Sequence, residues 1–200
     1  HEEQHQELLI TDIKYILGHN PLLPAYRCDY ERPEVNDILQ HNWIAIAEGV
    51  YEIGARGNAF CFDNELSRHK VYVPPFAIQS GLVTNEAFIA FINDGGYEDF
   101  RHWHSDGWEW VKQNGIHAPL YWQALEDVWY HYTPEGLTLV PLKQPLCHIS
   151  YYEAWAFAAW AGCRLPTEAE WEVSSGKFAW GERWEWTESA YLPYPGYRKA

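Results

Sequence analysis

The 200-residue sequence has few basic side chains: 14 lysines and arginines stand against 28 acidic residues, giving a formal charge of −14. Nucleic acid and membrane surfaces are therefore poor partners, because both are anionic and repel such a surface. No apolar run approaches the roughly 20 residues that a membrane-spanning helix needs. We expect a protein that binds neither nucleic acid nor membranes.

Cysteine is also scarce, and the four cysteines stand far apart at Cys28, Cys61, Cys147 and Cys163. None forms a CxxC pair, which disfavours a zinc knuckle and a disulfide scaffold. Reduced thiols in a cytoplasmic protein are the simplest interpretation. The GxSxG, P-loop and GxGxxG motifs are absent as well, and no secretory signal peptide is visible.

Residues 1–17 are predicted to form one helix. At about 100° per residue, one apolar face is formed by Leu9, Ile13, Ile16 and Leu17. Gly18 is a natural helix stop, and residues 19–42, with three prolines and no steady period, are expected to be a linker. The sequence has no methionine, even at its start, and it begins inside this helical pattern. We therefore expect a piece of a longer polypeptide.

From residue 43 onward, short elements predominate. WIAIAEGVYEIG predicts strands with a turn near Glu48-Gly49, and HKVYVPPFAIQ predicts a strand interrupted by Pro74-Pro75. Residues 97–148 hold many aromatic and turn residues, which favours irregular structure with short strands such as LTLVPL. The twelve tryptophans are expected to supply core area that regular elements do not.

Helices are expected in three stretches of this region. VTNEAFIAFINDGG has a cap at Thr84 or Asn85, whereas YYEAWAFAAWAG and EAEWEVSS each follow a capping box. The two boxes are formed by Ser150 with Glu153 and by Thr167 with Glu170. Helices, short strands and long loops in this mixture indicate the α+β fold class.

His1 and His5 are the first candidate site. Residues at i and i+4 lie on one helix face, so two imidazoles can chelate one metal ion. On spacing alone, two exposed helical histidines are the commoner case, and a working site needs at least a third ligand. Gln4 lies near this stripe and can hydrogen-bond a ligand beside the metal, although a solvated glutamine fits the spacing at least as well. Glu7 lies well round the helix from the two histidines, so it is expected to support a ligand from behind or to serve the structure, and not to bind the metal directly.

Two further stretches carry polar groups of interest. FCFDNE offers Asp63, Asn64 and Glu65 as hard oxygen donors, for Ca²⁺ or for a hydrogen-bond network that satisfies their own loop. GERWEWTES, residues 181–189, could wall a pocket, but a packed β-segment is the preferred interpretation.

The sequence resembles a known family. VTNEAFIAFI, ISYYEAWAFAAWAGCRLPTEAEWE and RWEWTES resemble the formylglycine-generating-enzyme-like (sulfatase-modifying-factor) domain, which has a C-type-lectin-like fold, over residues 43–200. HEEQHQELLITDIK resembles the last helix of a DinB-like four-helix bundle, so residues 1–18 are assigned to that helix and residues 19–42 to the linker. The domain is expected to be truncated at its C-terminus. FCFDNELSRHKVYV and SAYLPYPGY resemble the ergothioneine-type sulfoxide synthases, which combine these two domains.

The resemblance implies a non-haem iron enzyme that uses O₂ to join a cysteine-containing thiol, such as γ-glutamylcysteine, to hercynine (a histidine betaine). It implies that His1 and His5 hold Fe(II), with a third histidine outside this chain, and that Gln4 contacts the histidine-derived substrate. Neutral imidazoles suit Fe(II), and three ligands leave positions open for the substrates. A tyrosine proton donor is typical of the family, and the right region holds Tyr191, Tyr194 and Tyr197. These 200 residues alone are expected to be inactive.

Three alternatives remain open. An ovothiol-type synthase shares the architecture but uses free histidine and cysteine. A non-catalytic lectin-like binding module would bind no iron. A formylglycine-generating enzyme is less favoured, because the paired thiols of that family have no counterpart in this sequence. Cys147 and Cys163 precede residues 184–187, the WEWT segment, and are expected to be buried.

Overall fold

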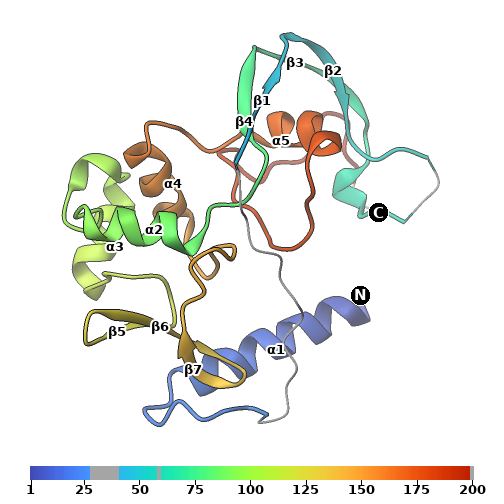
Figure 1. The fold of residues 1–200 in the computed structure, drawn as a ribbon. Helices are drawn as coiled ribbons and strands as arrows, with labels where there is room; N and C mark the ends of the chain where they lie inside the picture. Colours follow the sequence, from blue (N-terminus) through green and yellow to red (C-terminus); the bar gives the residue numbers. More distant parts are fainter. Residues whose placement is uncertain (28–40, 58–59, 199–200) are drawn as a thin grey trace.

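A computed structural model describes residues 1–27, 41–57 and 60–198 (Figure 1). The fold is α+β, as predicted, and combines helices with small antiparallel sheets. The helices are α1 (Glu2–Gly18), α2 (Asn85–Asn93), α3 (Ser105–Asn114), α4 (Tyr151–Trp160) and α5 (Glu168–Ser174). The strands are β1 (Trp43–Ile46), β2 (Gly49–Ile53), β3 (His69–Val73), β4 (Phe76–Gln79), β5 (Trp122–Leu125), β6 (Val128–Thr133) and β7 (Gly136–Leu139). Part of the expected linker, with Cys28 and Pro33, lies outside the described residues.

Strands β1 to β4 form one antiparallel ribbon that is interrupted in the middle. Strand β1 pairs with β4, ending at Ile46 opposite Phe76, and β2 pairs with β3, starting at Gly49 opposite Val73. Pro74-Pro75 stands at the interruption and donates no backbone N–H, so the ladder cannot continue there. The prediction of strands broken at this pair is confirmed. Helix α5 packs against β2 and β3.

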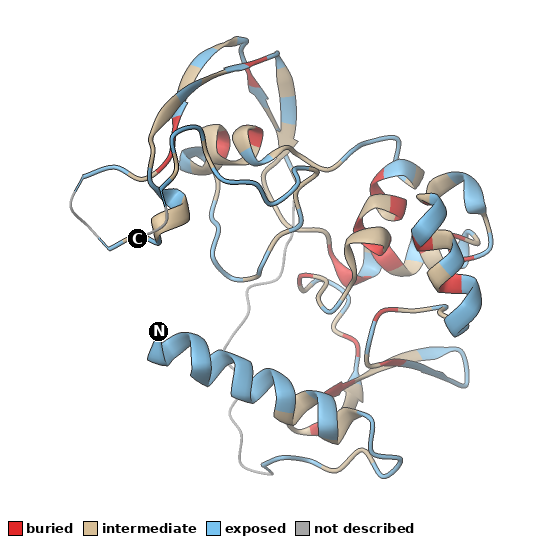
Figure 2. Ribbon diagram, turned by 180° about the vertical axis from the view of Figure 1, so that it is seen from behind, coloured by how far each residue is buried: buried red, intermediate tan, exposed pale blue. Residues whose placement is uncertain are grey.

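The hydrophobic core lies among α2, α3 and α4 (Figure 2). Its buried members are Phe88, Phe91, Tyr97, Trp103, Val111 and Ala156. The predicted caps of these helices and of α5 are confirmed, because Thr84 accepts a hydrogen bond from the Ala87 amide and both capping boxes form. Local sequence signals therefore fix where these helices begin.

Helix α3 was not predicted, because residues 97–148 were expected to be irregular apart from short strands. Its sequence, SDGWEWVKQN, contains Gly107 in the first turn, which lowers the intrinsic preference for a helix. A Cβ atom at Gly107 would lie 2.7 Å from the ring of Tyr152. The glycine thus allows close packing of α3 on α4, a tertiary advantage that propensity does not reveal. The expected strand in LTLVPL is confirmed as β7.

The tryptophans supply part of the core area, as predicted, with Trp103 inside the cluster and Trp108, Trp110 and Trp160 packed against it. Only Trp103 and Trp122 are buried among the twelve, whereas Trp43, Trp180, Trp184 and Trp186 are largely exposed. The predicted β-segment in GERWEWTES is wrong, since residues 181–189 form no strand. In that stretch the indoles of Trp184 and Trp186 donate to partners on other segments, so side-chain bonds rather than a ladder hold it in place.

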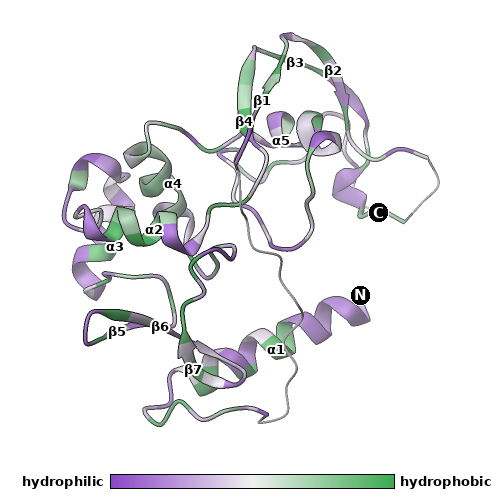
Figure 3. Ribbon diagram, in the orientation of Figure 1, coloured by the Kyte–Doolittle hydropathy of each residue, from purple (hydrophilic) through white to green (hydrophobic). Residues whose placement is uncertain are grey.

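Helix α1 has no buried residue and lies beside β6 and β7 (Figures 1 and 2). Of its predicted apolar face, Ile13 and Leu17 are half-buried, whereas Leu9 and Ile16 remain exposed. Its first turns are hydrophilic (Figure 3). A Cβ atom at Gly18 would lie 2.9 Å from two tyrosine rings of the β5–β6 region, so glycine lets this end of the helix approach the sheet closely. No helix in the described part of the chain is long and apolar enough to cross a membrane.

Candidate functional site

His1 and His5 lie together at the start of α1. His1 is the N-cap residue, its carbonyl accepts the His5 amide at 3.1 Å, and the two ring centroids are 4.5 Å apart at 81°. Both side chains are exposed, as is Gln4. Within residues 1–27, 41–57 and 60–198, no three His, Cys, Asp or Glu side chains are grouped so that they could hold a metal ion. The pair therefore supplies two imidazole donors.

Glu7 connects α1 to the WEWT segment, because the Trp184 indole N–H donates to Glu7 Oε1 at 2.6 Å. Since successive residues turn by about 100°, His1 and His5 lie about 120–160° around the helix from Glu7. Gln4 lies about 60° from Glu7 on the way to the histidines. The imidazoles thus occupy a different face from the one that contacts the domain, with Gln4 between the two.

The candidate calcium ligands are engaged in a loop network. Asp63 accepts the Tyr197 hydroxyl at 2.9 Å, and the Asn64 amide donates to the Tyr191 hydroxyl at 2.5 Å. Glu65 accepts a backbone amide of its own loop at 2.7 Å. These bonds match the loop-network interpretation: Asp63 and Asn64 join the loop to the C-terminal segment, and Glu65 satisfies the backbone of the loop itself.

Among the candidate proton donors, Tyr194 is the most enclosed by partners. Its hydroxyl donates to Glu168 at 3.1 Å and Glu172 at 3.2 Å. Partial burial and then these two carboxylates raise the pKa of Tyr194, so the phenol stays protonated. Tyr191, in contrast, is 89% exposed. The assignment of a proton donor to this region stays a prediction.

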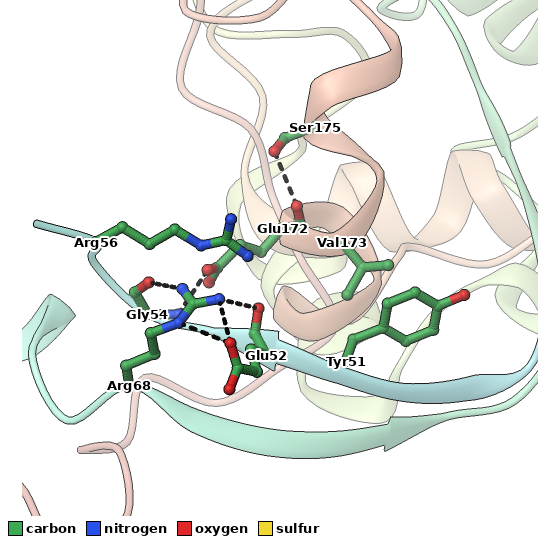
Figure 4. Close-up of a pocket in the computed structure, with 8 residues that line it drawn as sticks. All are labelled: Tyr51, Glu52, Gly54, Arg56, Arg68, Glu172, Val173 and Ser175. Atoms are coloured by element: carbon green, nitrogen blue, oxygen red, sulfur yellow. Dashed lines mark hydrogen bonds and ion pairs between the residues drawn. The ribbon is translucent and has the colours of Figure 1, made fainter.

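A cavity of about 320 Å³ lies between β2, the loop after it and α5 (Figure 4). Its lining consists of Tyr51, Glu52, Gly54, Arg56, Arg68, Glu172, Val173 and Ser175. Arg68 donates to the Glu52 carboxylate and to the Gly54 carbonyl, while Glu172 accepts the Gly54 amide at 2.6 Å. Because these ionic groups bind one another and the backbone, the cavity is mainly a structural junction of α5 with the ribbon.

The cysteines are free thiols where described, namely Cys61, Cys147 and Cys163. The expectation that Cys147 and Cys163 are buried is wrong: the first is half-buried and the second is exposed. Cys163 lies three residues after the end of α4, and its amide bonds the Ala158 carbonyl in the turn that ends the helix. This position after the helix end is open to solvent.

Sequence reasoning missed a second contact of α1 with the domain. The Lys14 ammonium lies 2.7 Å from Nε2 of His148 and 4.9 Å from the centroid of the Tyr121 ring. The two residues of the hydrogen bond are 134 positions apart in the chain, so no periodicity or spacing signal could associate them.

Comparison with known proteins agrees with this architecture. The chain is 30% identical to the hercynine oxygenase of Mycobacterium tuberculosis, over 98% of the chain and 56% of the relative. It is 28% identical to that of Mycolicibacterium thermoresistibile, over 98% and 54%. A formylglycine-generating enzyme from Thermomonospora curvata is 31% identical over 80% and 58%. The chain thus spans about half the length of these curated relatives. The model of the sulfatase-modifying factor enzyme 1-like domain matches residues 31–196, and the chain belongs to this family.

Proposed function

We propose that this chain is part of a non-haem iron, O₂-dependent sulfoxide synthase. It would join a cysteine-containing thiol, such as γ-glutamylcysteine, to hercynine. The relatives named hercynine oxygenase support this proposal, because their similarity extends over 98% of the chain and thus includes α1. The observation that carries it is the pair of adjacent imidazoles on the helix that Glu7 joins to the WEWT segment.

The donor set fits Fe(II) in part. His1 and His5 are neutral nitrogen donors on adjacent turns of one face, as a mononuclear iron site requires. Two donors do not complete such a site, so a third histidine from outside the described residues would join them. Bound Fe(II) would supply O₂ activation, and the exposed imidazole face of α1 leaves room for the missing ligand.

Residues of this chain would also orient the substrates. Gln4 lies between the imidazole face and the face that contacts the domain, so its amide can hydrogen-bond the histidine-derived substrate beside the metal. Trp184, which is 88% exposed and bonds Glu7, offers an aromatic surface beside the face of α1 that contacts the domain. Aromatic faces attract quaternary ammonium groups, and hercynine carries one. A tyrosine of residues 191–197 would hold the proton.

The test uses the full-length protein that contains this chain, loaded anaerobically with Fe(II). We expect His5→Ala to lose most of the iron affinity and His117→Ala to retain it, since His117 is an exposed histidine in the loop between α3 and β5. The wild type should form a sulfoxide from hercynine and γ-glutamylcysteine under O₂, detected by mass spectrometry.

Two outcomes would contradict the proposal. A protein without measurable Fe(II) affinity, or one whose affinity survives His5→Ala, would favour a non-catalytic binding module. A product formed from free histidine and cysteine, with none from hercynine, would instead show an ovothiol-type synthase.

A further inference from the structure

We propose that the hydrogen bond between Lys14 and His148 sets the orientation of α1 on the domain, which makes both of them positioning residues for the imidazole pair. This inference rests on the proposed function, because it concerns how His1 and His5 are presented. The contact joins the C-terminal half of α1 to the residue that lies two positions before the Ser150 cap of α4.

The chemistry of the contact fixes its direction. An ammonium group only donates, so the Lys14 ammonium is the donor, Nε2 of His148 accepts, and the imidazole proton lies on Nδ1. The same ammonium lies over the ring of Tyr121, with 4.9 Å to its centroid. The rings of Tyr121 and His148 meet nearly perpendicularly at 5.0 Å. The Lys14 side chain therefore contacts two aromatic side chains, those of His148 and Tyr121.

Both receiving residues have a backbone conformation that is rare outside glycine. His148 has φ 61° and Tyr121 has φ 74°, in the left-handed region. Such conformations persist only where surrounding structure holds them, and they concentrate at functional positions. Here the His148 carbonyl accepts the Leu120 amide at 3.1 Å, and the Tyr121 carbonyl accepts the Tyr132 amide at 3.0 Å. Backbone hydrogen bonds of the domain thus hold His148 and Tyr121, the two residues that contact Lys14, in place.

The charges around His148 keep it a neutral acceptor. Burial of the imidazole, followed by the positive charges of Lys14, His131 and Arg183, lowers the pKa of His148. The residue as a whole retains solvent-exposed surface, so burial weakens the charged form less than full enclosure would. The positive charge of the adjacent Lys14 ammonium also lowers the pKa of His148. At neutral pH the imidazole therefore accepts from the lysine and does not repel it.

The contact lies on the same face of α1 as the bond from Trp184. Glu7 and Lys14 are seven residues apart, which places them about 20° apart around the helix. Two points on one face, separated by about 10 Å along the axis, determine both the tilt and the rotation of a helix. Because the imidazoles lie on another face, loss of one point would turn them relative to the WEWT segment.

The test compares Lys14→Met, which keeps the aliphatic stem, with Lys14→Arg, which keeps a donor. Lys112→Met is the matched control, because Lys112 also lies 4.9 Å above an aromatic ring, that of Trp108, on helix α3. Hydrogen exchange is measured on the full-length protein without iron. We expect the amides of residues 2–18 to exchange several-fold faster in Lys14→Met, with α2 to α5 unchanged and with recovery in Lys14→Arg.

The iron-loaded variants provide the functional arm. Since displaced reacting groups cost about 10- to 100-fold in rate, kcat/KM of Lys14→Met should fall about ten-fold or more, mainly through kcat. Its Fe(II) affinity should stay within about two-fold of the wild type, because the change moves α1 as a unit and touches no ligand. Wild-type exchange of residues 2–18 in Lys14→Met would overturn the inference, as would an effect of equal size in Lys112→Met. A wild type that makes no sulfoxide refutes the proposed function, whereas the exchange measurement still decides the role of Lys14.

Discussion

Tyr97 and Glu153 form a buried pair whose disruption should measurably destabilise the domain. The Tyr97 hydroxyl donates to Glu153 Oε1 at 2.5 Å, and the two residues are only 6% and 2% exposed. The other carboxylate oxygen accepts the Ser150 amide at 2.6 Å, as part of the capping box of α4. Tyr97→Phe removes one donor and leaves a carboxylate oxygen enclosed without it. Bonds to charged groups contribute about 1.5–3 kcal/mol, so we expect a loss of that size in the free energy of unfolding.

The loss should depend on pH in a defined direction. Burial raises the pKa of Glu153, and the bond from Tyr97 opposes this rise by stabilising the carboxylate. A carboxyl with a raised pKa in the folded state favours folding at low pH and opposes it as the pH rises through that pKa. Without the donor the charged form is less stable still. The destabilisation by Tyr97→Phe should therefore be larger at pH 8 than at pH 5.

Urea unfolding at the two pH values measures both quantities. Tyr72→Phe is the matched control, because Tyr72 makes the same type of bond to Glu48 at 2.9 Å but is 59% exposed. The control should leave the unfolding midpoint nearly unchanged, because water can replace the lost hydrogen-bond partner of the exposed Glu48 carboxylate. If Tyr97→Phe destabilises by less than about 0.5 kcal/mol, or equally at both pH values, the assignment of a buried and costly carboxylate is refuted.

Two further variants test other contacts. Gly18→Ala should cost about 1–3 kcal/mol where α1 meets the sheet, because the new Cβ atom would lie 2.9 Å from two tyrosine rings; faster hydrogen exchange in residues 2–18 checks this, and unchanged exchange would contradict it. Arg164→Ala removes two bonds, of 2.6 and 2.7 Å, to the buried carboxylate of Glu170, whose pKa Arg164 lowers. That stabilisation is present above the ordinary carboxyl pKa and is lost as the pH falls, so the drop in Tm should be large at pH 7 and shrink toward pH 3. Arg101→Ala, which breaks an exposed pair, should change Tm little at either pH.

Helix starts could be predicted from the sequence because their signals are local. Ser150 with Glu153, and Thr167 with Glu170, satisfy backbone donors within three residues of each other. The interruption at Pro74-Pro75 is similarly intrinsic, since proline lacks an N–H wherever it stands. Such features depend little on the remainder of the chain, so the α+β class followed from them.

Helix α3 and the WEWT segment could not be predicted, because distant partners decide their conformation. Gly107 disfavours a helix locally but allows Tyr152 to pack closely against it. The alternating aromatics of residues 181–189 resemble a strand, yet the Trp186 indole donates to the Ile149 carbonyl and that of Trp184 to Glu7. The identity of these partners is a property of the tertiary fold.

One part of the candidate site could likewise be predicted from the sequence, and another part could not. The His1 and His5 pair follows from helical spacing, and its geometry on α1 agrees with the ring separation of 4.5 Å. Its assignment to iron stays a prediction. The Lys14 contact with His148 could not be foreseen, because 134 residues separate the two.

A small tilt of helix α1 at its C-terminal end produces a larger displacement at its N-terminal end. Its close contacts with the sheet lie at its C-terminal end, near Gly18, whereas the imidazoles project from the opposite end. The distance from Lys14 to His1 along the axis is about 20 Å, so a tilt of about 3° at the anchored end displaces the first imidazole by about 1 Å. Such a displacement, relative to the WEWT segment, exceeds the roughly 0.5 Å within which the groups of a functional site must be held. The bond from Trp184 to Glu7 meets the helix about midway between Lys14 and His1, where it limits such a tilt.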